Sequence, residues 1–382
     1  MTHEGFDVAI AGGGPAGAAA AIRLARAGLR VVLADGDDRR DDKIGESLAP
    51  SARLVLERIG VWEQFLAAGH RPCYANRSSW GGGEVETYEF LRDPHGHGWH
   101  IDRRRFEAML AGEAARAGCR WLSQTFLRRL SRSDDGWRLT IGAGGAHRDI
   151  TARFVVDATG RASHVARSRG ARREIHDRLV ALVAFLALEA EPAPDGGTLV
   201  EAVADGWWYT ARLPDQRLTC AFVTDADVLC RSGGRSATAW EARLARSIHT
   251  RARVAASGQR LAASPIVVAA GSAIVHPVAG PGWLAAGDAA AAYDPLTSHG
   301  IAAAIADGWD AAAVVLAALD GDPAAADVYA YRVRRSFTRY LEVRAAYYEM
   351  EERWPGSPFW QRRSTRDREG DRKLDRRLPS VV

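Results

Sequence analysis

The stretch Gly12-Gly13-Gly14-Pro15-Ala16-Gly17 follows an apolar run, Phe6 to Ile10, and precedes the Ala-rich segment 18–27. Glycines at its first, third and sixth positions allow a tight turn, close approach of the backbone to a pyrophosphate, and packing of a helix on a strand. The amides at the helix N-terminus would face the phosphates. A second apolar run, 31–34, ends at Asp35, about 20 residues after the turn, where a carboxylate can accept hydrogen bonds from ribose hydroxyls. The spacing predicts a strand, turn, helix and strand that bind a dinucleotide.

Apolar patterning predicts where the chain leaves this layer and where it returns. Alternating apolar positions are typical of antiparallel strands, and continuous apolar runs are typical of buried parallel strands. We expect helices at 47–68, 103–117 and 300–319, strands at 154–157 and 283–286, antiparallel strands at 74–100 and 178–270, and a helical segment after 319. The pattern predicts an α/β protein whose antiparallel sheet meets the substrate.

The composition excludes several classes of protein. With 47% hydrophobic residues and a net charge of +4, the chain is typical of a folded, soluble protein. The N-terminus has no signal-peptide pattern, and the apolar stretch 311–319 is shorter than the about 20 residues that cross a bilayer. We therefore expect a cytoplasmic protein with no membrane span. Basic residues form no concentrated stripe, which disfavours nucleic-acid binding.

Cysteine and histidine spacing gives no metal signature. The cysteines show no paired spacing, and we expect all of them in the core: Cys73, Cys119, Cys220 and Cys230. Three histidines, His95, His97 and His100, lie close together but lack acidic or cysteine partners at ligand spacing. No metal site is expected.

Two further motifs extend the nucleotide-binding pattern. The first is Asp157-Ala158-Thr159-Gly160 at the end of an apolar strand, although an ordinary strand-to-loop turn would have the same composition. The second is Gly287-Asp288-Ala289-Ala290, followed by the segment 294–300 that leads into a helix. Taken alone, Asp288 could be a helix cap. Together with the glycine turn, both motifs indicate a dinucleotide site built from distant segments.

The three motifs, in this order, resemble those of the FAD-dependent monooxygenases of the p-hydroxybenzoate hydroxylase type and of the related flavin halogenases. The resemblance covers most of the chain. It implies an FAD-binding Rossmann-like domain of the glutathione-reductase type, an inserted antiparallel β-sheet substrate domain and a C-terminal helical segment. The implied FAD domain is 1–73, 101–175 and 271–320, the substrate domain is 74–100 and 176–270, and the C-terminal helical segment with its basic tail is 321–382.

The resemblance also assigns positions around the cofactor. It implies that the first motif holds the ADP pyrophosphate, that Asp288 contacts ribityl and pyrophosphate oxygens, and that 295–300 borders the isoalloxazine. The segment 157–160 would lie near the pyrophosphate and is linked to the use of NADH or NADPH as reductant. Arg103 matches a basic position that contacts the phosphates. The expected FAD-binding residues are Gly12, Gly14, Pro15, Ala16, Gly17, Asp35, Glu46, Ser47, Arg103, Asp157, Gly160, Gly287, Asp288, Pro295 and Gly300.

Two softer motifs, Gly45 to Pro50 and Trp354 to Trp360, resemble the halogenase-like branch, which includes flavoproteins that mature quinone cofactors by oxidising a peptide-bound tryptophan. A surface turn with Pro and Gly would explain either motif equally. Tryptophan halogenases use a lysine near the substrate and a glutamate in the segment matching 295–300. Here Lys43 and Lys373 are the only lysines, and Thr297 stands at the glutamate position. The sequence therefore disfavours halogenation by that route.

Direct oxygen transfer needs a dry pocket and a group that manages a proton. The resemblance implies that reduced flavin and oxygen give a C4a-hydroperoxide. His299 is the leading catalytic candidate, since imidazole titrates near neutral pH, and Pro295 and Thr297 accompany it. A histidine bonded to backbone at a helix start is the alternative. Trp207 and Tyr209 could stack on an aromatic substrate, with Trp208 on the opposite face of the strand, or could belong to the core.

The sequence thus predicts an FAD-dependent monooxygenase that hydroxylates an indole- or phenol-like ring, free or bound to a peptide or protein. Alternatives are a halogenase with altered residues, a flavin reductase of the geranylgeranyl type, and a non-catalytic flavin-binding interaction protein. A separate flavin reductase is a further candidate partner. The arginine-rich stretch 362–377 is typical of a solvated tail, with docking of a protein substrate as the sharper hypothesis.

Overall fold

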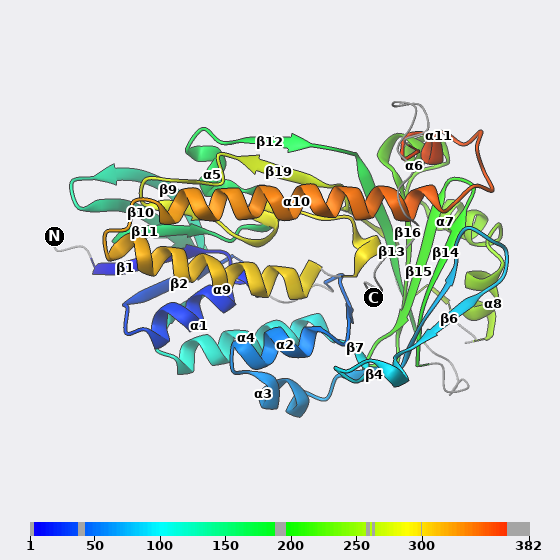
Figure 1. The fold of residues 1–382 in the computed structure, drawn as a ribbon, viewed down its shortest axis with the longest axis horizontal. Coiled ribbons are helices and arrows are strands. Elements are labelled where there is room, and N and C mark those ends of the chain that lie inside the picture. Colours follow the sequence, from blue (N-terminus) through cyan, green and yellow to red (C-terminus); the bar gives the residue numbers. More distant parts are fainter. Residues whose placement is uncertain are drawn as a thin grey trace.

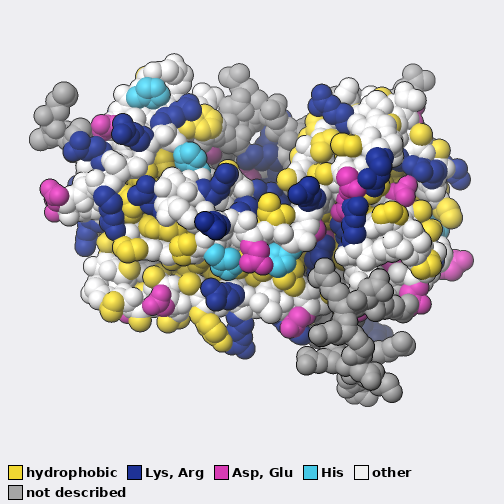
Figure 2. Space-filling view, turned by 90° about the horizontal axis from the view of Figure 1, so that it is seen from above, with side chains coloured by type: hydrophobic (Ala, Val, Ile, Leu, Met, Phe, Trp, Pro, Cys, Tyr) yellow, Lys and Arg dark blue, Asp and Glu magenta, His cyan; other side chains and the backbone are white. Residues whose placement is uncertain are grey.

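The structure is a computed structural model that describes residues 4–36, 43–187, 196–256, 260–261, 264–298 and 300–364. One end of the molecule is a parallel sheet covered by helices, and the other end is a large antiparallel sheet (Figure 1). The long helix α10 (Ala325–Glu349) runs along the molecule from the first part to the second. Lys and Arg side chains on the face seen in Figure 2 are interspersed with acidic and apolar ones and form no single stripe.

The parallel sheet forms because its strands are short apolar runs that are buried on both faces. Its parallel strands lie in the order β21 (Trp283–Ala285), β11 (Ala146–Asp157), β1 (Glu4–Ala11), β2 (Val31–Asp35) and β8 (Arg120–Ser123). The helices α1 (Pro15–Arg26), α4 (Arg103–Arg116) and α9 (Gly300–Leu319) cover one face. A hairpin, β9 (Phe126–Ser133) and β10 (Gly136–Ala143), packs Leu127, Leu139 and Ile141 on the other. Strand β20 (Ala279–Gly280) pairs with β21 at the edge.

The antiparallel sheet has an apolar cluster on each of its faces. Its order is β17 (Arg260–Leu261), β13 (Leu179–Ala187), β16 (Leu218–Asp225), β15 (Gly206–Arg212), β14 (Thr198–Val203), β5 (Ala75–Ser79) and β6 (Glu86–Glu89), and β18 (Ile266–Ala269) also pairs with β13. Neighbouring strands are antiparallel except β14 and β5, which pair in parallel. Three short helices, α6 (Ala226–Arg231), α7 (Ala237–Leu244) and α8 (His249–Ala256), cover one face, where Trp240 and Val254 pack. The other face is turned toward α10 and the parallel sheet.

Smaller elements connect the two parts. Two three-stranded sheets are formed by β3 (Ser47–Leu48), β7 (Gly98–His100) and β4 (Arg71–Cys73), and by β12 (Arg172–Ile175), β19 (Ala273–His276) and β22 (Ala291–Ala292). The remaining helices are α2 (Ala52–Arg58), α3 (Trp62–Ala67), α5 (His164–Ser168), α11 (Pro358–Gln361) and the 3-10 turns η1 (Phe90–Arg92), η2 (Gly160–Ala162), η3 (Gly287–Ala289) and η4 (Pro295–Thr297).

The predicted fold class is confirmed, and three local expectations need correction. The segment 47–68 begins as strand β3, because Ser47 and Leu48 pair with β7, so helix starts only at Ala52. Strand β7 belongs to that small sheet and not to the antiparallel sheet with 75–89. Cys230 is exposed, whereas the other three cysteines are buried as expected.

Helix α9 is long and apolar enough, by length and composition alone, to cross a membrane. The apolar stretch 311–319 considered in the sequence is only the second half of this helix. The helix packs between α1 and α10, and Ile305, Ala312 and Val315 are fully buried. A mostly apolar helix in the core of an α/β layer passes the same test of length and hydropathy.

Candidate functional site

The glycine turn lies where the sequence places it, between β1 and α1. Gly12 has a φ of +104°, a backbone conformation that favours glycine, and a Cβ on it would lie 2.6 Å from the carbonyl carbon of Ala158. Gly17 packs on the carbonyl of Gly12. Gly14 differs, because no atom lies within 4 Å of where its Cβ would stand. The backbone at Gly14 is therefore open to a ligand at the N-terminus of α1, where Pro15 stands in the first turn.

Asp35 ends β2 and is 4% exposed. A Cβ on Gly13 would collide with its carboxyl group, so the turn and the carboxylate lie in direct contact. The expected ribose contact stays a prediction, and the structure gives Asp35 a position beside the turn that suits it.

Two neighbouring residues of α9 contact the nucleotide-binding turns: Gly308 packs against Ala16, and Asp307 bonds to Gly287. A Cβ on Gly308 would lie 2.7 Å from the carbonyl carbon of Ala16, so only glycine lets α9 touch the first turn of α1. The preceding residue, Asp307, accepts a hydrogen bond of 2.5 Å from the amide of Gly287, and the hydroxyl of Tyr329 lies 3.1 Å from its other oxygen. Burial raises the pKa of Asp307 to about 6. Sequence reasoning missed both, although an aspartate and a glycine inside an apolar helix were the available signal.

Asp157 is fully buried, and its carboxylate serves the loop that follows it. One oxygen accepts from the amide and hydroxyl of Thr159, at 3.0 and 2.6 Å, and the other accepts from the amide of Ala166 at 2.8 Å. These bonds hold the loop that follows the strand, and the expected contact of Asp157 with the cofactor stays a prediction. Gly160, with a φ of +62°, has no atom within 4 Å of a would-be Cβ and leaves its side of the loop open.

Asp288 lies in η3 among arginines. Its carboxylate is 3.5 Å from the guanidinium of Arg161, and Arg173 and Arg103 also act on it electrostatically. Burial raises the pKa of Asp288 above its ordinary value despite these cations. A carboxylate that is itself held by cations next to the open turn fits a role in contacting hydroxyl groups of a ligand.

Arg103 joins the Gly45 motif to α4. Its guanidinium donates to the carbonyl of Ile44 at 2.8 Å and to Glu107 at 2.5 Å, and Glu107 also pairs with Lys43. A Cβ on Gly45 would lie 2.5 Å from Arg103 and 3.6 Å from Ile301 at the start of α9. The Gly45 motif therefore runs past the helix start that follows the segment 295–300.

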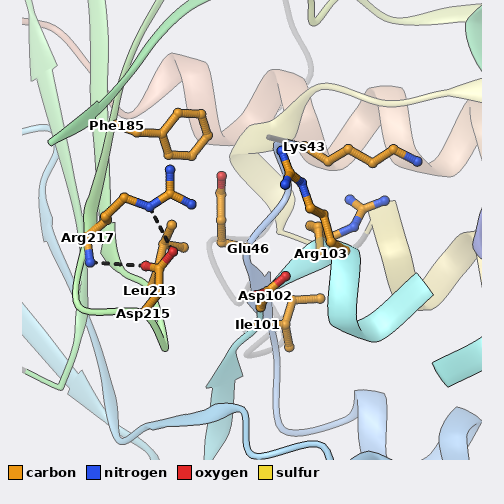
Figure 3. A pocket seen from close by; sticks show the side chains of 10 residues that line it. Lys43, Glu46, Ile101, Asp102, Arg103, Phe185, Leu213, Asp215 and Arg217 are labelled. Carbon is orange, nitrogen blue, oxygen red and sulfur yellow. Dashed lines mark hydrogen bonds and ion pairs between the residues drawn. The ribbon is translucent and has the colours of Figure 1, made fainter. Parts of the chain in front are cut away.

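Glu46 stands between two walls of a pocket (Figure 3). Lys43 and residues 101–104 form one wall, and Phe185, Leu213 and the ion-paired Asp215 and Arg217 form the other. The Glu46 side chain is 2% exposed, and its carboxylate accepts a hydrogen bond of 3.3 Å from Thr219 of β16. Burial raises its pKa to about 7, although Arg103 and the nearby backbone amides favour the anion. The structure thus gives Glu46 a place facing both the expected flavin region and the antiparallel sheet.

Ser47 and Tyr209 meet in a buried polar network next to Glu46. The Ser47 hydroxyl lies 2.8 Å from the Tyr209 hydroxyl and 3.4 Å from that of Thr198, which is 3.0 Å from Nε2 of His100. His100 is fully buried in this network. No group of three His, Cys, Asp or Glu among the described residues is arranged to hold a metal ion.

The segment expected to border the isoalloxazine is held by α10. Asp294, 1% exposed, accepts hydrogen bonds from Arg344 at 3.0 Å and from the hydroxyl of Tyr348 at 2.8 Å. Its amide donates to the hydroxyl of Tyr340 at 2.7 Å, and its other carboxylate oxygen caps the amide of Leu296. Pro295 and Thr297 lie in η4, and Gly300 opens α9 with free space at its Cα. His299 lies outside the described residues, so its predicted catalytic and substrate-binding roles stay predictions.

Trp207 is buried by the C-terminal segment and does not line the pocket. It is 1% exposed, and its indole nitrogen donates to the Tyr348 hydroxyl at 3.1 Å. Phe359 and Trp360 pack on the same face of the sheet, so the Trp354 motif combines an exposed turn at Pro355 and Gly356 with two buried aromatic residues. Trp208 packs on the opposite face, as strand alternation predicts. Trp207 therefore belongs to the core, which is one of the two alternatives that the sequence left open.

The first arginines of the basic tail form ion pairs with aspartates at the end of β16 and in α6. Arg362 and Arg363 donate to the carboxylates of Asp225 and Asp227, and Arg363 is 7% exposed. The rest of the tail, 365–382, lies outside the described residues.

The residues present fit FAD. The backbone is open at Gly14, Gly160 and Gly300, in segments that the fold brings to one edge of the parallel sheet. Cationic side chains, Arg103 and Arg161, stand beside these openings, which suits a pyrophosphate.

Comparison with known proteins agrees with this fit. A family profile described as "FAD binding domain" matches residues 5–342. The putative FAD-dependent oxidoreductase LodB of Marinomonas mediterranea is 26% identical over 363 residues, which cover 94% of this chain and 97% of that protein. The structure of the peptidyl tryptophan dihydroxylase QhpG is 26% identical, with a TM-score of 0.76 over 94% of this chain and 78% of its own.

The myxobacterial chondrochloren halogenase CndH shares the fold, with a TM-score of 0.86 and 24% identity over 94% of this chain and 86% of its own. The predicted relationship to flavin-dependent oxygenases and halogenases is confirmed at this level, and the narrower p-hydroxybenzoate hydroxylase type stays a prediction.

Proposed function

Because the chain belongs to the FAD binding domain family and is an FAD-dependent oxidoreductase, we propose that it hydroxylates an indole- or phenol-like ring, free or carried by a peptide or protein. Bound FAD, reduced by NADH, NADPH or a separate reductase, supplies the chemistry that activates molecular oxygen. The protein's part is to admit the ring, exclude water and manage protons.

The observation that carries the proposal is the pocket beside Glu46. An aromatic side chain, Phe185, and a buried carboxylate face the same space between the flavin-binding layer and the antiparallel sheet. The Arg217 guanidinium stacks over the Phe185 ring at 5.1 Å, so this wall is held in place. Similarity to a peptidyl tryptophan dihydroxylase supports an aromatic substrate.

Halogenation is the second candidate, and Lys43 is the observation that favours it. Lys43 lines the pocket, although sequence reasoning left it outside the site. Its amine pairs with Glu107, and Figure 3 shows the side chain extending away from Glu46. An amine held in this way is poorly placed to activate an oxidant at the substrate, so we rank hydroxylation first.

The test is product mass analysis with the purified FAD-loaded protein, labelled oxygen gas, NADH or NADPH, and free and peptide-bound aromatic compounds. A product heavier by one labelled oxygen atom, with faster nicotinamide oxidation in the presence of that compound, supports hydroxylation. A mass shift that depends on bromide or chloride would replace it with halogenation. Absence of flavin reduction by either nicotinamide, with turnover restored by a flavin reductase, would show that the reductant comes from a partner.

A further inference from the structure

Glu46 is a buried carboxylate whose position carries a desolvation cost. It is 2% exposed, and no arginine or lysine among the residues that the structure describes bonds to it, although Arg103 lies close enough to act on it electrostatically. Nearby Glu107 is equally buried, but it pairs with both Lys43 and Arg103. Burying a carboxylate without a bonded cation is costly, and such groups concentrate at functional sites.

The position of Glu46 links the two halves of the site. The preceding residues run past Ile301, at the start of the helix that follows the segment 295–300, and Ile44 packs in the same apolar cluster as Leu296 of that segment. On the other side, Thr219 of β16 donates to the Glu46 carboxylate. A ring that enters beside Phe185 would therefore meet Glu46 between the flavin region and the sheet.

We propose that Glu46 is the base that takes the proton from the ring carbon during hydroxylation, an assignment that rests on the proposed function. Oxygen transfer leaves that carbon bearing both oxygen and hydrogen. The C–H bond then breaks, its electron pair restores the aromatic ring, and the proton moves to a carboxylate oxygen of Glu46. One atom of molecular oxygen enters the product and the other leaves as water, with the two electrons supplied by reduced flavin.

The groups around Glu46 allow this role. The charged groups that line the pocket with Glu46 are Arg103 and Arg104 of α4, Asp102 before that helix, Asp215 and Arg217 of the β15–β16 turn, and Lys43, whose amine points away from Glu46 to Glu107. The phenol of Tyr209 on β15 also lies close enough to interact with it electrostatically. Burial raises the pKa of Glu46 to about 7, which lets the carboxylate accept a proton at neutral pH and release it again.

The test compares the FAD-loaded wild type with Glu46→Gln and Glu46→Asp, using the substrate identified by labelled oxygen and its ring-deuterated form. We expect Glu46→Gln to lower kcat by about 100-fold or more, the usual contribution of a positioned base. The rise of kcat through about pH 7 should disappear, and a deuterium isotope effect should appear because C–H cleavage becomes rate-limiting. Glu46→Asp should restore part of the rate. Glu113→Gln, which removes a buried carboxylate of α4 that pairs with Arg116, is the matched control and should leave the pH profile unchanged.

The outcomes separate the two proposals. If the wild type forms no hydroxylated product, the proposed function fails and the role of Glu46 falls with it. If the wild type hydroxylates and Glu46→Gln keeps its rate, its pH profile and its lack of isotope effect, the assignment of the base alone is wrong. If Glu46→Gln does not bind FAD, the Thr219→Val variant tests the assignment of Glu46 as the base instead. Removal of its hydroxyl should raise the inflection in the pH profile, because that hydroxyl stabilises the anion, and an unmoved inflection overturns the assignment.

Discussion

Replacing Gly308 by alanine should weaken FAD binding, although Gly308 is not itself an expected contact of the cofactor and lies in α9 well after the expected contact at Gly300. The new Cβ would lie 2.7 Å from the carbonyl carbon and 2.8 Å from the Cα of Ala16, and closer still to its oxygen. Ordinary contacts begin near 3.4 Å, so α9 and the first turn of α1 must separate by at least about 0.7 Å. Overpacking of this kind costs about 1–3 kcal/mol, which outweighs the about 1 kcal/mol that alanine gains over glycine inside a helix.

Gly112 provides the matched control. It also lies inside a helix, α4, but the nearest atom to its would-be Cβ is a flexible arginine nitrogen at 3.7 Å. Gly112→Ala should therefore raise the stability of the apoprotein by about 1 kcal/mol, whereas Gly308→Ala should lower it. Because the displaced turn includes the open backbone at Gly14, FAD affinity should fall about tenfold in Gly308→Ala and stay unchanged in Gly112→Ala.

The assay is thermal unfolding of both apoproteins together with titration of each by FAD, followed by quenching of flavin fluorescence. A Gly308→Ala protein that melts above wild type and binds FAD equally well would refute the packing argument.

Three further predictions follow from contacts already described. Gly14→Val should leave apoprotein stability unchanged, because the Cβ position is open, but should abolish FAD retention; a normal ratio of flavin to protein absorbance would contradict the placement of the pyrophosphate. His70 is 6% exposed, and burial lowers its pKa from 6.5 to about 4, so the folded state excludes a proton that the unfolded chain accepts. The neutral imidazole contributes fully to the free energy of unfolding above pH 6.5, and this contribution is lost as the pH falls toward 4, which costs about 2 kcal/mol by pH 5. In denaturant unfolding, His70→Leu should lose correspondingly less stability in acid than the wild type. An equal loss of stability in both proteins would exclude His70 as its source. Tyr348→Phe removes a bond to the Asp294 carboxylate and should cost about 1–3 kcal/mol and speed FAD release, whereas Tyr331→Phe, on an exposed position of the same helix, should do neither; equal FAD release rates would remove Tyr348 from the support of the site.

The parts of the site that the sequence predicted are those whose geometry is local. The glycine turn, Asp35 and the start of α4 at Arg103 follow from spacing within one strand, turn and helix unit, and each lies where expected. Asp157 was recognised by its motif, but its bonds to Thr159 and Ala166 were not predicted, because they depend on how the next turn folds.

The parts that the sequence did not predict depend on contacts between distant segments. Phe185 and Lys43 are more than a hundred residues apart, and only the packing of the two sheets brings them to one pocket. Alternation placed Trp207 and Trp208 on opposite faces, but it carries no information on what covers each face, so the sequence could not decide between a core and a substrate-facing Trp207. The same holds for Asp294, whose partners on α10 follow it by about fifty residues.

The hydrogen bonds between α10 and Asp294 determine when the FAD site can be completed during synthesis of the chain. The first turn of the nucleotide site is made from residues near the N-terminus, yet the segment expected beside the flavin ring is fastened by Tyr340, Arg344 and Tyr348. A nascent chain can form the pyrophosphate cradle early, but it cannot close the ring end of the site until α10 has left the ribosome. Stable FAD capture is therefore expected to begin only after α10 has been synthesised, and fragments that end before α10 should capture FAD poorly even when their parallel sheet is complete.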